Sequence, residues 1–306
     1  LINNVLLAVA AGAVMLGTLY PLFLDALGLG KISVGPPYFE TVFVPLVAPV
    51  AVLLAVGPYV RWKAARLGEI FARLRRPAAA AVVLALVLAA ALGARSALML
   101  FGLLLASWVV LASSWHLVER LRQPAGGSVW ARLRSQPRAY YGMLLAHLGV
   151  GVFALGVTVV KGLETSQDVR MKPGDTTTVA GHTFRFGGVQ ELRGPNYIAA
   201  RATVEVTRGE ARLGVLYPEK RLYTASGMPM TEAAIDRGIL RDLYVSLGEA
   251  VSPEEWIVRV NHKPFVNWIW GGCLLMALGG GLAASDRRYR IARARQTRTA
   301  TAVAQA

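Results

Sequence analysis

A single histidine, His147, lies inside the apolar run YYGMLLAHLGVGVF at residues 140–153. At a rise of 1.5 Å per residue it lies roughly 10 Å beyond Tyr140, at a depth where a membrane holds little water. Ionisable side chains at such depths are rare and are functional candidates by default. Neutral imidazole is a strong ligand for heme iron, so heme ligation is one chemistry open to this residue. The alternative is a helix–helix hydrogen bond across a seam of small residues.

Small and basic residues near His147 extend this hypothesis. Gly151 and Ala154 share its helix face, and they leave room either for a flat, bulky cofactor or for a close helix. Arg138 and Arg134, at the end of the same predicted helix, can pair with heme propionates, although loop arginines are more often solvated topology markers. The predicted cofactor-binding residues are therefore His147, Gly151 and Arg138, with His147 as the metal ligand.

The other three histidines give weaker signals. His116 is expected to anchor a helix at the membrane interface, His182 to be structural beside a turn, and His262 to form a junction hydrogen bond. His116 lies about three residues from a basic loop and His147 about nine, which is a depth difference of roughly 9 Å. Two coaxial imidazoles need the same depth, so the second ligand of a heme at His147 is predicted outside this chain.

Six apolar runs dominate a chain of 306 residues that is 55% hydrophobic. Each is long enough to cross a hydrocarbon core about 30 Å thick. They lie at about 3–24, 42–60, 78–94, 96–117, 140–160 and 264–284. Pro45 and Pro49 are expected to break the second run.

The net charge of +15 is concentrated in three stretches, 61–76, 119–138 and 287–298, whereas the loops at 25–41 and 94–96 hold only Lys31 and Arg95. Short loops rich in Lys and Arg remain cytoplasmic. With six spans, all three basic stretches fall on one side. The charge is interpreted as an orientation signal, which argues against nucleic-acid binding.

Residues 161–263 break the membrane pattern and hold nearly equal numbers of basic and acidic residues. The stretches DTTTVAGHTFRFGGVQ and NYIAARATVEVTRGEARLGVLYPEKRLYT alternate polar and apolar residues around Gly-containing turns. Such alternation predicts a mostly antiparallel β domain. One segment, MTEAAIDRGILRDLYVSLGEA, is ambiguous and is expected to include a helical turn after Thr231.

The predicted fold is a polytopic α-helical membrane protein with six transmembrane helices and an inserted extracytoplasmic β domain. The predicted divisions are 1–160 (five helices), 161–263 (a periplasmic β-rich domain), 264–284 (the sixth helix) and 285–306 (a basic cytoplasmic tail). Cys273, the one cysteine, lies in the last span and is interpreted as a small core residue. The sequence has no Walker A, GxGxxG, HExxH or CxxC motif, and no catalytic residue is predicted.

The segments YYGMLLAHLGVGVFALG, YPEKRLYTASGMPMTEAAIDRGILRDLYVSLGE and HKPFVNWIWGGCLLMALGG resemble the C-terminal half of the CcmF/NrfE family, heme lyase components of bacterial cytochrome c maturation. The resemblance covers nearly the whole chain. It implies transfer of heme from the periplasmic chaperone CcmE to the CxxCH cysteines of apocytochrome c, together with the thiol-handling proteins CcmH and CcmI.

The resemblance also implies a b-type heme (heme b) inside the membrane, held by two transmembrane histidines. His147 stands at the AHLG position of one ligand, and the other lies in the family's N-terminal half, which would here be the same protein or a second subunit. The electron donor to this heme is open, with a quinol as one candidate. The implied location is the bacterial inner membrane.

The family's external tryptophan-rich heme platform, the WWD motif, is absent from the seven tryptophans of this chain. The chain is therefore expected to be either a fragment or one subunit of a split lyase. The competing hypothesis is a non-catalytic assembly or docking subunit of a cytochrome c biogenesis complex, in which His147 only packs. A small-molecule permease is a third alternative, but its usual paired broken helices are not apparent.

Overall fold

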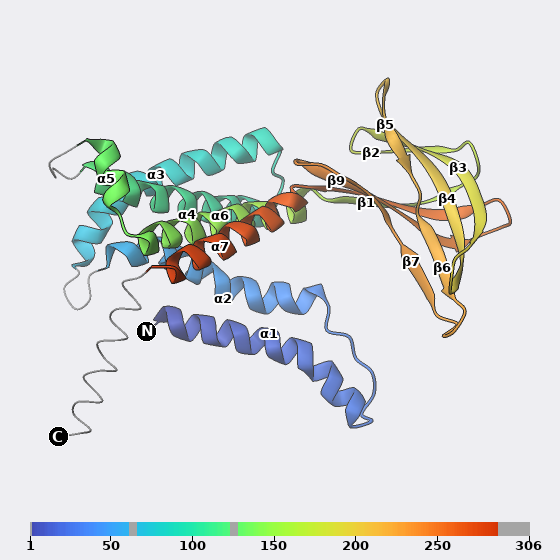
Figure 1. The fold of residues 1–306 in the computed structure, drawn as a ribbon, viewed down its shortest axis with the longest axis horizontal. Helices are drawn as coiled ribbons and strands as arrows, with labels where there is room; N and C mark the ends of the chain where they lie inside the picture. The colour runs from blue at the N-terminus through green and yellow to red at the C-terminus, as the bar shows by residue number, and fades with distance from the viewer. Residues whose placement is uncertain (1, 61–65, 123–127, 287–306) are drawn as a thin grey trace. The chain divides into compact units, whose positions relative to one another are not determined.

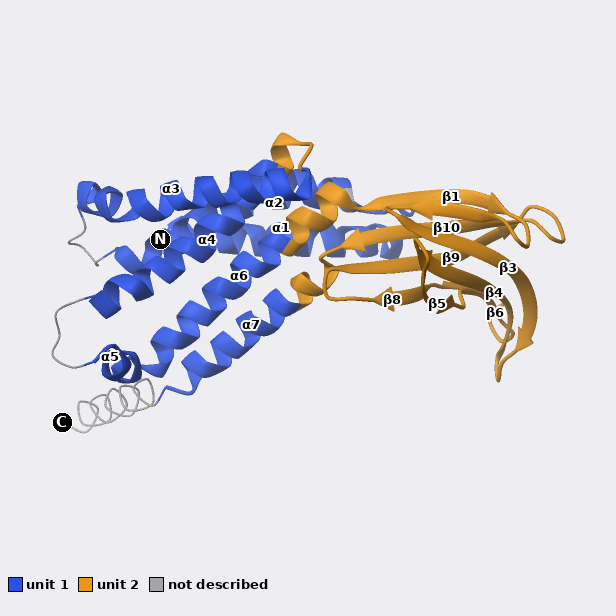
Figure 2. Ribbon diagram, turned by 90° about the horizontal axis from the view of Figure 1, so that it is seen from above, with its two compact units in different colours: residues 1–93, 100–155, 271–306 blue, residues 94–99, 156–270 orange. Residues whose placement is uncertain are grey.

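The computed structural model describes residues 2–60, 66–122 and 128–286. Arg61, Lys63 and nearly all of the predicted basic tail lie outside the described residues. The chain divides into two compact units, one made of residues 1–93, 100–155 and 271–306 and the other of 94–99 and 156–270 (Figure 2). We call them the helical unit and the β unit, and each is described by itself.

Six helices of the described chain are long and apolar enough to cross a membrane, which confirms the predicted six spans (Figure 1). They are α1 (Ile2–Ala26), α2 (Pro36–Val56), α3 (Leu67–Leu92), α4 (Ala97–Arg122), α6 (Arg138–Leu163) and α7 (Val266–Ala284). A short 3₁₀ turn, η1 (Gly57–Tyr59), follows α2, and a short helix, α5 (Val129–Ser135), precedes α6.

Prolines were expected to interrupt the second span, but the helices continue through them. The predicted break at Pro45 and Pro49 is wrong, because α2 continues through both residues. Membrane helices tolerate proline where local adjustment or neighbouring groups satisfy the freed backbone atoms. Helix α3 likewise passes through Pro77 and so begins before the apolar run that predicted it.

Glycines at intervals of seven residues set the packing of α6 against α7. A Cβ added to Gly149 would lie 2.7 Å from Met276 N and 2.8 Å from Gly272 O. Gly142 and Gly279 meet in the same way one heptad away. Because backbone atoms occupy the place of a side chain, the two helices approach as closely as small-residue motifs allow.

The β unit contains two antiparallel sheets. One has the order β1-β10-β9-β8, and the other has the order β2-β3-β4-β6-β7 with β5 paired to β4. The strands are β1 (Thr165–Met171), β2 (Thr176–Val179), β3 (His182–Arg193), β4 (Tyr197–Arg208), β5 (Ala211–Leu216), β6 (Glu219–Tyr223), β7 (Pro229–Glu232), β8 (Ala234–Arg237), β9 (Arg241–Ala250) and β10 (Trp256–Pro264). The predicted antiparallel β class is confirmed.

The ambiguous segment after Thr231 forms strands, so the expected helical turn there is wrong. Strand β8 pairs in register with β9, from Ala234 opposite Val245 to Arg237 opposite Asp242. Its backbone hydrogen bonds are therefore supplied by a neighbouring strand, which sequence spacing does not reveal. The Ala-Gly turn between β2 and β3 has positive φ at both Ala180 and Gly181, the geometry of a tight hairpin.

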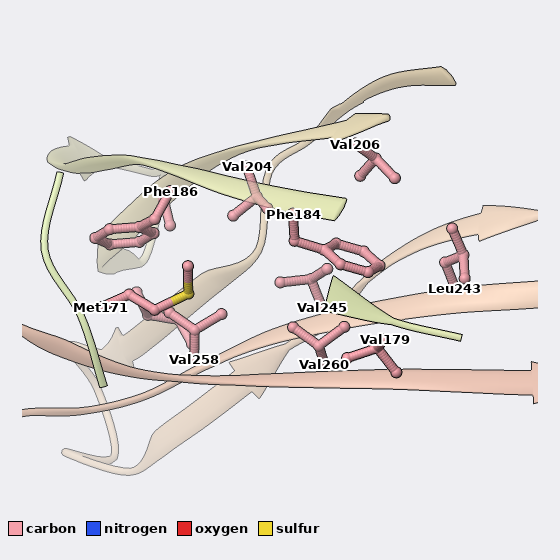
Figure 3. Close-up of a cluster of buried hydrophobic side chains, with 12 residues drawn as sticks. Met171, Val179, Phe184, Phe186, Val204, Val206, Leu243, Val245, Val258 and Val260 are labelled. Carbon is pink, nitrogen blue, oxygen red and sulfur yellow. The ribbon is translucent and has the colours of Figure 1, made fainter. Parts of the chain in front are cut away.

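Aliphatic and aromatic side chains from both sheets meet in one core (Figure 3). Phe184 and Phe186 of β3 are fully buried, as are Val245 of β9 and Val260 of β10. The two phenylalanines have one polar residue between them, so strand alternation places both on the inner face. This core is the part of the chain where burial follows the two-residue period predicted from sequence.

Candidate functional site

His147 lies in the middle of α6 and is partly buried. Its Nδ1 atom is buried and has no hydrogen-bond partner among the described residues, and no hydrogen bond from its other ring nitrogen is present there. A buried polar atom without a partner is costly and calls for an explanation. An axial bond to heme iron would use one ring nitrogen, so the residue fits the predicted ligand role.

Helix geometry places Tyr140 and the predicted propionate partner Arg138 on opposite faces of α6 relative to His147. Tyr140 precedes it by seven residues, close to two full turns, and so shares its face. Arg138 precedes it by nine residues, two and a half turns, and so projects from the opposite side of α6. Arg138 is exposed at the helix start. Its proposed pairing with a heme propionate stays a prediction and gains no support from this placement.

A polar cluster surrounds His116 on the face of α6 that carries His147. His116 Nδ1 and the Tyr140 hydroxyl form a hydrogen bond of 3.2 Å. The ring of Tyr59 meets the His116 ring edge-on at 5.0 Å between centroids. The Arg120 guanidinium lies 4.2 Å from the centre of the Tyr140 ring and donates to Gln136 Oε1 at 2.7 Å. His116 therefore contacts side chains of η1 and α6, and its expected role as an interface anchor stays a prediction.

This contact also fixes the relative depth of the two membrane histidines. His116 bonds to Tyr140, which lies seven residues from His147 along α6, a rise of roughly 10 Å. The separation agrees with the depth difference predicted from the sequence. Because the residue that His116 bonds lies about two turns from His147 on α6, this contact gives no support to His116 as the opposite axial ligand of an iron bound at His147.

Gly151 contacts a helix. A Cβ added to it would overlap Val110 Cγ2 of α4 and lie 3.4 Å from Ala106 O. Of the two alternatives for this small residue, space for a cofactor or a close helix, the geometry favours the close helix. The side of His147 that bears Gly151 is thus covered by α4.

Two further residues near the start of α6 have partners of their own. The Arg134 guanidinium lies 4.7 Å from the centre of the Trp130 ring, within α5. The Asp286 carboxylate accepts from the backbone N–H of Ala139 at 3.0 Å, where the first turn of α6 has free donors. The Asp286 bond ties the segment after α7 to the start of α6, whereas the Arg134 contact is internal to α5.

Two histidines of the β unit are stacked on each other. The rings of His182 and His262 have centroids 5.7 Å apart, and His182 Nδ1 donates to Ala180 O at 3.0 Å. The Nδ1 atom of His262 is buried and has no hydrogen-bond partner among the described residues, so the expected junction hydrogen bond is not made by this atom. Burial lowers the pKa of both imidazoles, and the nearby Arg241 and Arg208 lower it further.

The described residues contain no group of three or more His, Cys, Asp or Glu side chains that could hold a metal ion. An apolar groove of about 600 Å³ lies between α1 and α2, and its lining includes Val14 and Phe43 but no histidine. Sequence reasoning missed the cluster of Tyr59, Tyr140 and Arg120. The seven-residue spacing of Tyr140 and His147 was the available signal, since both fall on one helix face.

The fold defines a multi-pass membrane protein with an inserted β sandwich and, inside one span, a histidine whose Nδ1 has no hydrogen-bond partner among the described residues. Residues 162–264 match a family model described as the CcmF C-terminal beta-sandwich. The cytochrome c-type biogenesis protein CcmF of Pseudomonas aeruginosa is 46% identical over 95% of this chain and 44% of the relative. That of Pseudomonas fluorescens is 45% identical over 94% of this chain and 43% of the relative.

A solved structure titled cytochrome c heme lyase CcmF has the same fold, with a TM-score of 0.70 and 22% sequence identity. The structural match covers 92% of this chain and 44% of the chain in the solved structure. The chain belongs to the CcmF/NrfE family and corresponds to its C-terminal region. It spans less than half the length of the curated relatives described here. The six apolar helices and the bacterial relatives support a multi-pass inner-membrane protein.

Proposed function

We propose that this chain is the C-terminal part of a cytochrome c heme lyase and contributes His147 as one axial ligand of a b-type heme inside the membrane. The observation that carries the proposal is the partly buried imidazole of α6, whose Nδ1 atom is buried and has no partner among the described residues. Family membership supports the heme-related role, because the relatives are named for cytochrome c biogenesis.

His147 would hold the iron from one side, with the second ligand supplied from outside these residues. A bound b-type heme supplies a redox-active iron that can be kept reduced. Two neighbouring helices support His147: α7 packs against the glycine face of α6, and Val110 of α4 covers Gly151. The Tyr140–His116 bond joins α6 to α4 two turns away, so the imidazole is carried on a fixed helix.

The basic loops between the helices determine the proposed topology. The β unit would face the periplasm, and the basic loops and the C-terminal segment would face the cytoplasm, because basic loops remain inside. The proposed domains are 1–160, 161–263, 264–284 and 285–306. Cys273 lies in α7 and the sequence has no other cysteine. The thiols for heme attachment would therefore come from apocytochrome c and its reductant.

The partners follow from the proposed reaction. The β unit would dock the heme chaperone CcmE, the thiol-handling proteins CcmH and CcmI, and the apocytochrome with its CxxCH motif. The N-terminal half, in the same polypeptide or in a second subunit, would supply the heme platform and the second histidine. A quinol is the proposed electron donor to the membrane heme.

The test is heme binding by variants of two membrane histidines. The chain is co-expressed with the N-terminal part of the Pseudomonas aeruginosa relative and purified, and its reduced absorbance spectrum is recorded. His147→Ala should lose the b-type spectrum, and His116→Ala, which removes the bond to Tyr140, should retain it. Gel filtration of both variants checks that the complex still assembles.

A second candidate is a docking subunit in which His147 only packs. The close contact of Gly151 with Val110 favours a packing role for this face of α6. That function predicts an unchanged heme content in His147→Ala, together with reduced recovery of the complex. The same purification therefore separates the two functions.

A further inference from the structure

The tight turn between β8 and β9 carries two adjacent exposed aliphatic side chains. Ile239 is 80% exposed and Leu240 is 58% exposed in the described chain. The backbone of the turn is tightly packed at Gly238, where an added Cβ would lie 2.8 Å from Arg241 O. Neither side chain belongs to the core of the β unit, and exposed apolar side chains of this size can mark a surface that meets a membrane or another protein.

Hydrogen bonds attach this turn to the start of α7. Phe265 N donates to Leu240 O at 2.9 Å, and Trp268 Nε1 donates to Ile239 O at 3.1 Å. Asn267 Nδ2 donates to Gly238 O at 2.6 Å. All three carbonyls of the turn are thus held by the first residues of a membrane-spanning helix.

Asp242 reinforces this attachment from the base of β9. Its Oδ1 atom accepts from Gly238 N and from Asn267 Nδ2, both at 3.1 Å. Asp242 is buried, so its carboxylate lies at the centre of the junction. The turn and the helix start therefore form one hydrogen-bonded piece of structure.

The length of α7 determines where its start, and the β8–β9 turn bonded to it, lie relative to the membrane. Its 19 residues rise about 28 Å, close to the thickness of a hydrocarbon core, so its first turn must lie at the membrane boundary. Trp268 and the exposed Trp270 suit that level, because tryptophan is enriched in the interfacial belts of membrane proteins. The turn bonded to Trp268 must lie at the same level.

We propose that the β8–β9 turn inserts Ile239 and Leu240 into the lipid interface and is a membrane anchor of the β unit. It adds a third attachment to those made by α6 and α7. The neighbouring Arg237 is exposed, so one cationic side chain lies beside the apolar tip where lipid headgroups would be, while Arg241 pairs with Asp236. The inference depends on α7 crossing the membrane and is independent of heme ligation.

Spin-label accessibility in lipid nanodiscs tests the proposal. Ile239→Cys and Leu240→Cys are prepared in the full chain with Cys273→Ala, and each is labelled with a nitroxide. The matched control is Val251→Cys, an exposed apolar residue in the turn at the other end of β9, roughly 34 Å away along the strand. Collision rates are measured with oxygen, which concentrates in lipid, and with a water-soluble nickel chelate.

Insertion predicts that oxygen collides several-fold more often than nickel at residues 239 and 240, and that the order is reversed at residue 251. Nickel access at 239 and 240 equal to that at 251 would place the turn in water and overturn the proposal. Exclusion of both reagents would show that a protein surface covers the turn, which would also overturn it. Labels at exposed positions leave the fold intact, and gel filtration confirms this for each variant.

Discussion

The helical unit and the β unit bury opposite kinds of residue. In the β unit the largest side chains, such as Phe184 and Phe186, are fully buried. In the helical unit many buried positions are alanine, and large residues such as Phe71 and Leu67 are more than three-quarters exposed. Large residues such as phenylalanine therefore form the core of the β unit, whereas several of them are exposed in the helical unit, where Leu103 is one large residue that is fully buried.

The solvent around each unit explains the difference. Burial of apolar surface away from water drives the β sandwich together. Lipid tails are as apolar as leucine, so no such force acts between membrane helices, and close packing of small residues takes its place. In the helices, glycine and alanine therefore predict contact faces, while phenylalanine and leucine predict lipid.

One substitution made in both units should show the largest contrast. Phe184→Ala should lower the free energy of unfolding by about 3–5 kcal/mol, because it opens a cavity in a fully buried site. Phe71→Ala, on the exposed face of α3, should change it by less than about 0.5 kcal/mol. Thermal unfolding in lipid nanodiscs measures both, and equal losses would contradict the comparison.

Neighbouring glycines of α7 provide a smaller, internal contrast. Gly272→Leu should cost about 1–3 kcal/mol, because its side chain would meet the backbone of Gly149 and Phe153. Gly271→Leu should be nearly neutral, since a Cβ there has no neighbour within 4 Å. Gel filtration after graded heating reports the loss of folded protein. A similar loss in both variants would argue against packing by the glycine face.

The histidine pair should make the β unit sensitive to acid. Burial lowers the pKa of His182 and His262 in the folded state, so the unfolded state binds protons first as pH falls. Their contribution is therefore present above the unfolded value of about 6.5 and is lost as pH falls below it. Hydrogen exchange of β-unit amides between pH 7.5 and 5.5, corrected for intrinsic rates, measures this loss. His262→Gln should flatten the dependence.

A surface ion pair should give the smallest effect. Asp168 on β1 accepts two hydrogen bonds from Arg259 on β10, at 2.6 and 2.7 Å, and this bonding lowers the pKa of the carboxyl. Both side chains are about half exposed. Asp168→Asn should cost about 0.2–1 kcal/mol, and the cost should shrink in high salt. A larger, salt-independent loss in denaturant titrations would show that the pair has another role.

The sequence was sufficient to predict an element where a local pattern of apolar residues determines its secondary structure. Apolar runs predicted the six helices, and alternation around Gly181 predicted the first hairpin. Prediction from the sequence failed where contacts with a distant part of the chain or with neighbouring groups determine the conformation. The strand after Thr231 depends on pairing with β9, and α2 continues through Pro45 and Pro49.

The candidate site shows the same limit. His147 was found because an imidazole inside an apolar run is unusual by itself. The cluster of Tyr59, His116 and Tyr140 was missed because it joins η1, α4 and α6, whose contacts no local pattern encodes. Gly151 was predicted to bind a cofactor, with a close helix as the alternative, and the structure places Val110 of α4 against it.

Rescue by free imidazole tests the central claim most directly. His147→Gly is prepared with the N-terminal part of the Pseudomonas aeruginosa relative, and the reduced spectrum is recorded with and without added imidazole. If His147 is an axial ligand, the variant should lose the b-type spectrum and imidazole should restore it. A His147→Gly variant with an unchanged b-type spectrum before any imidazole is added would contradict the account.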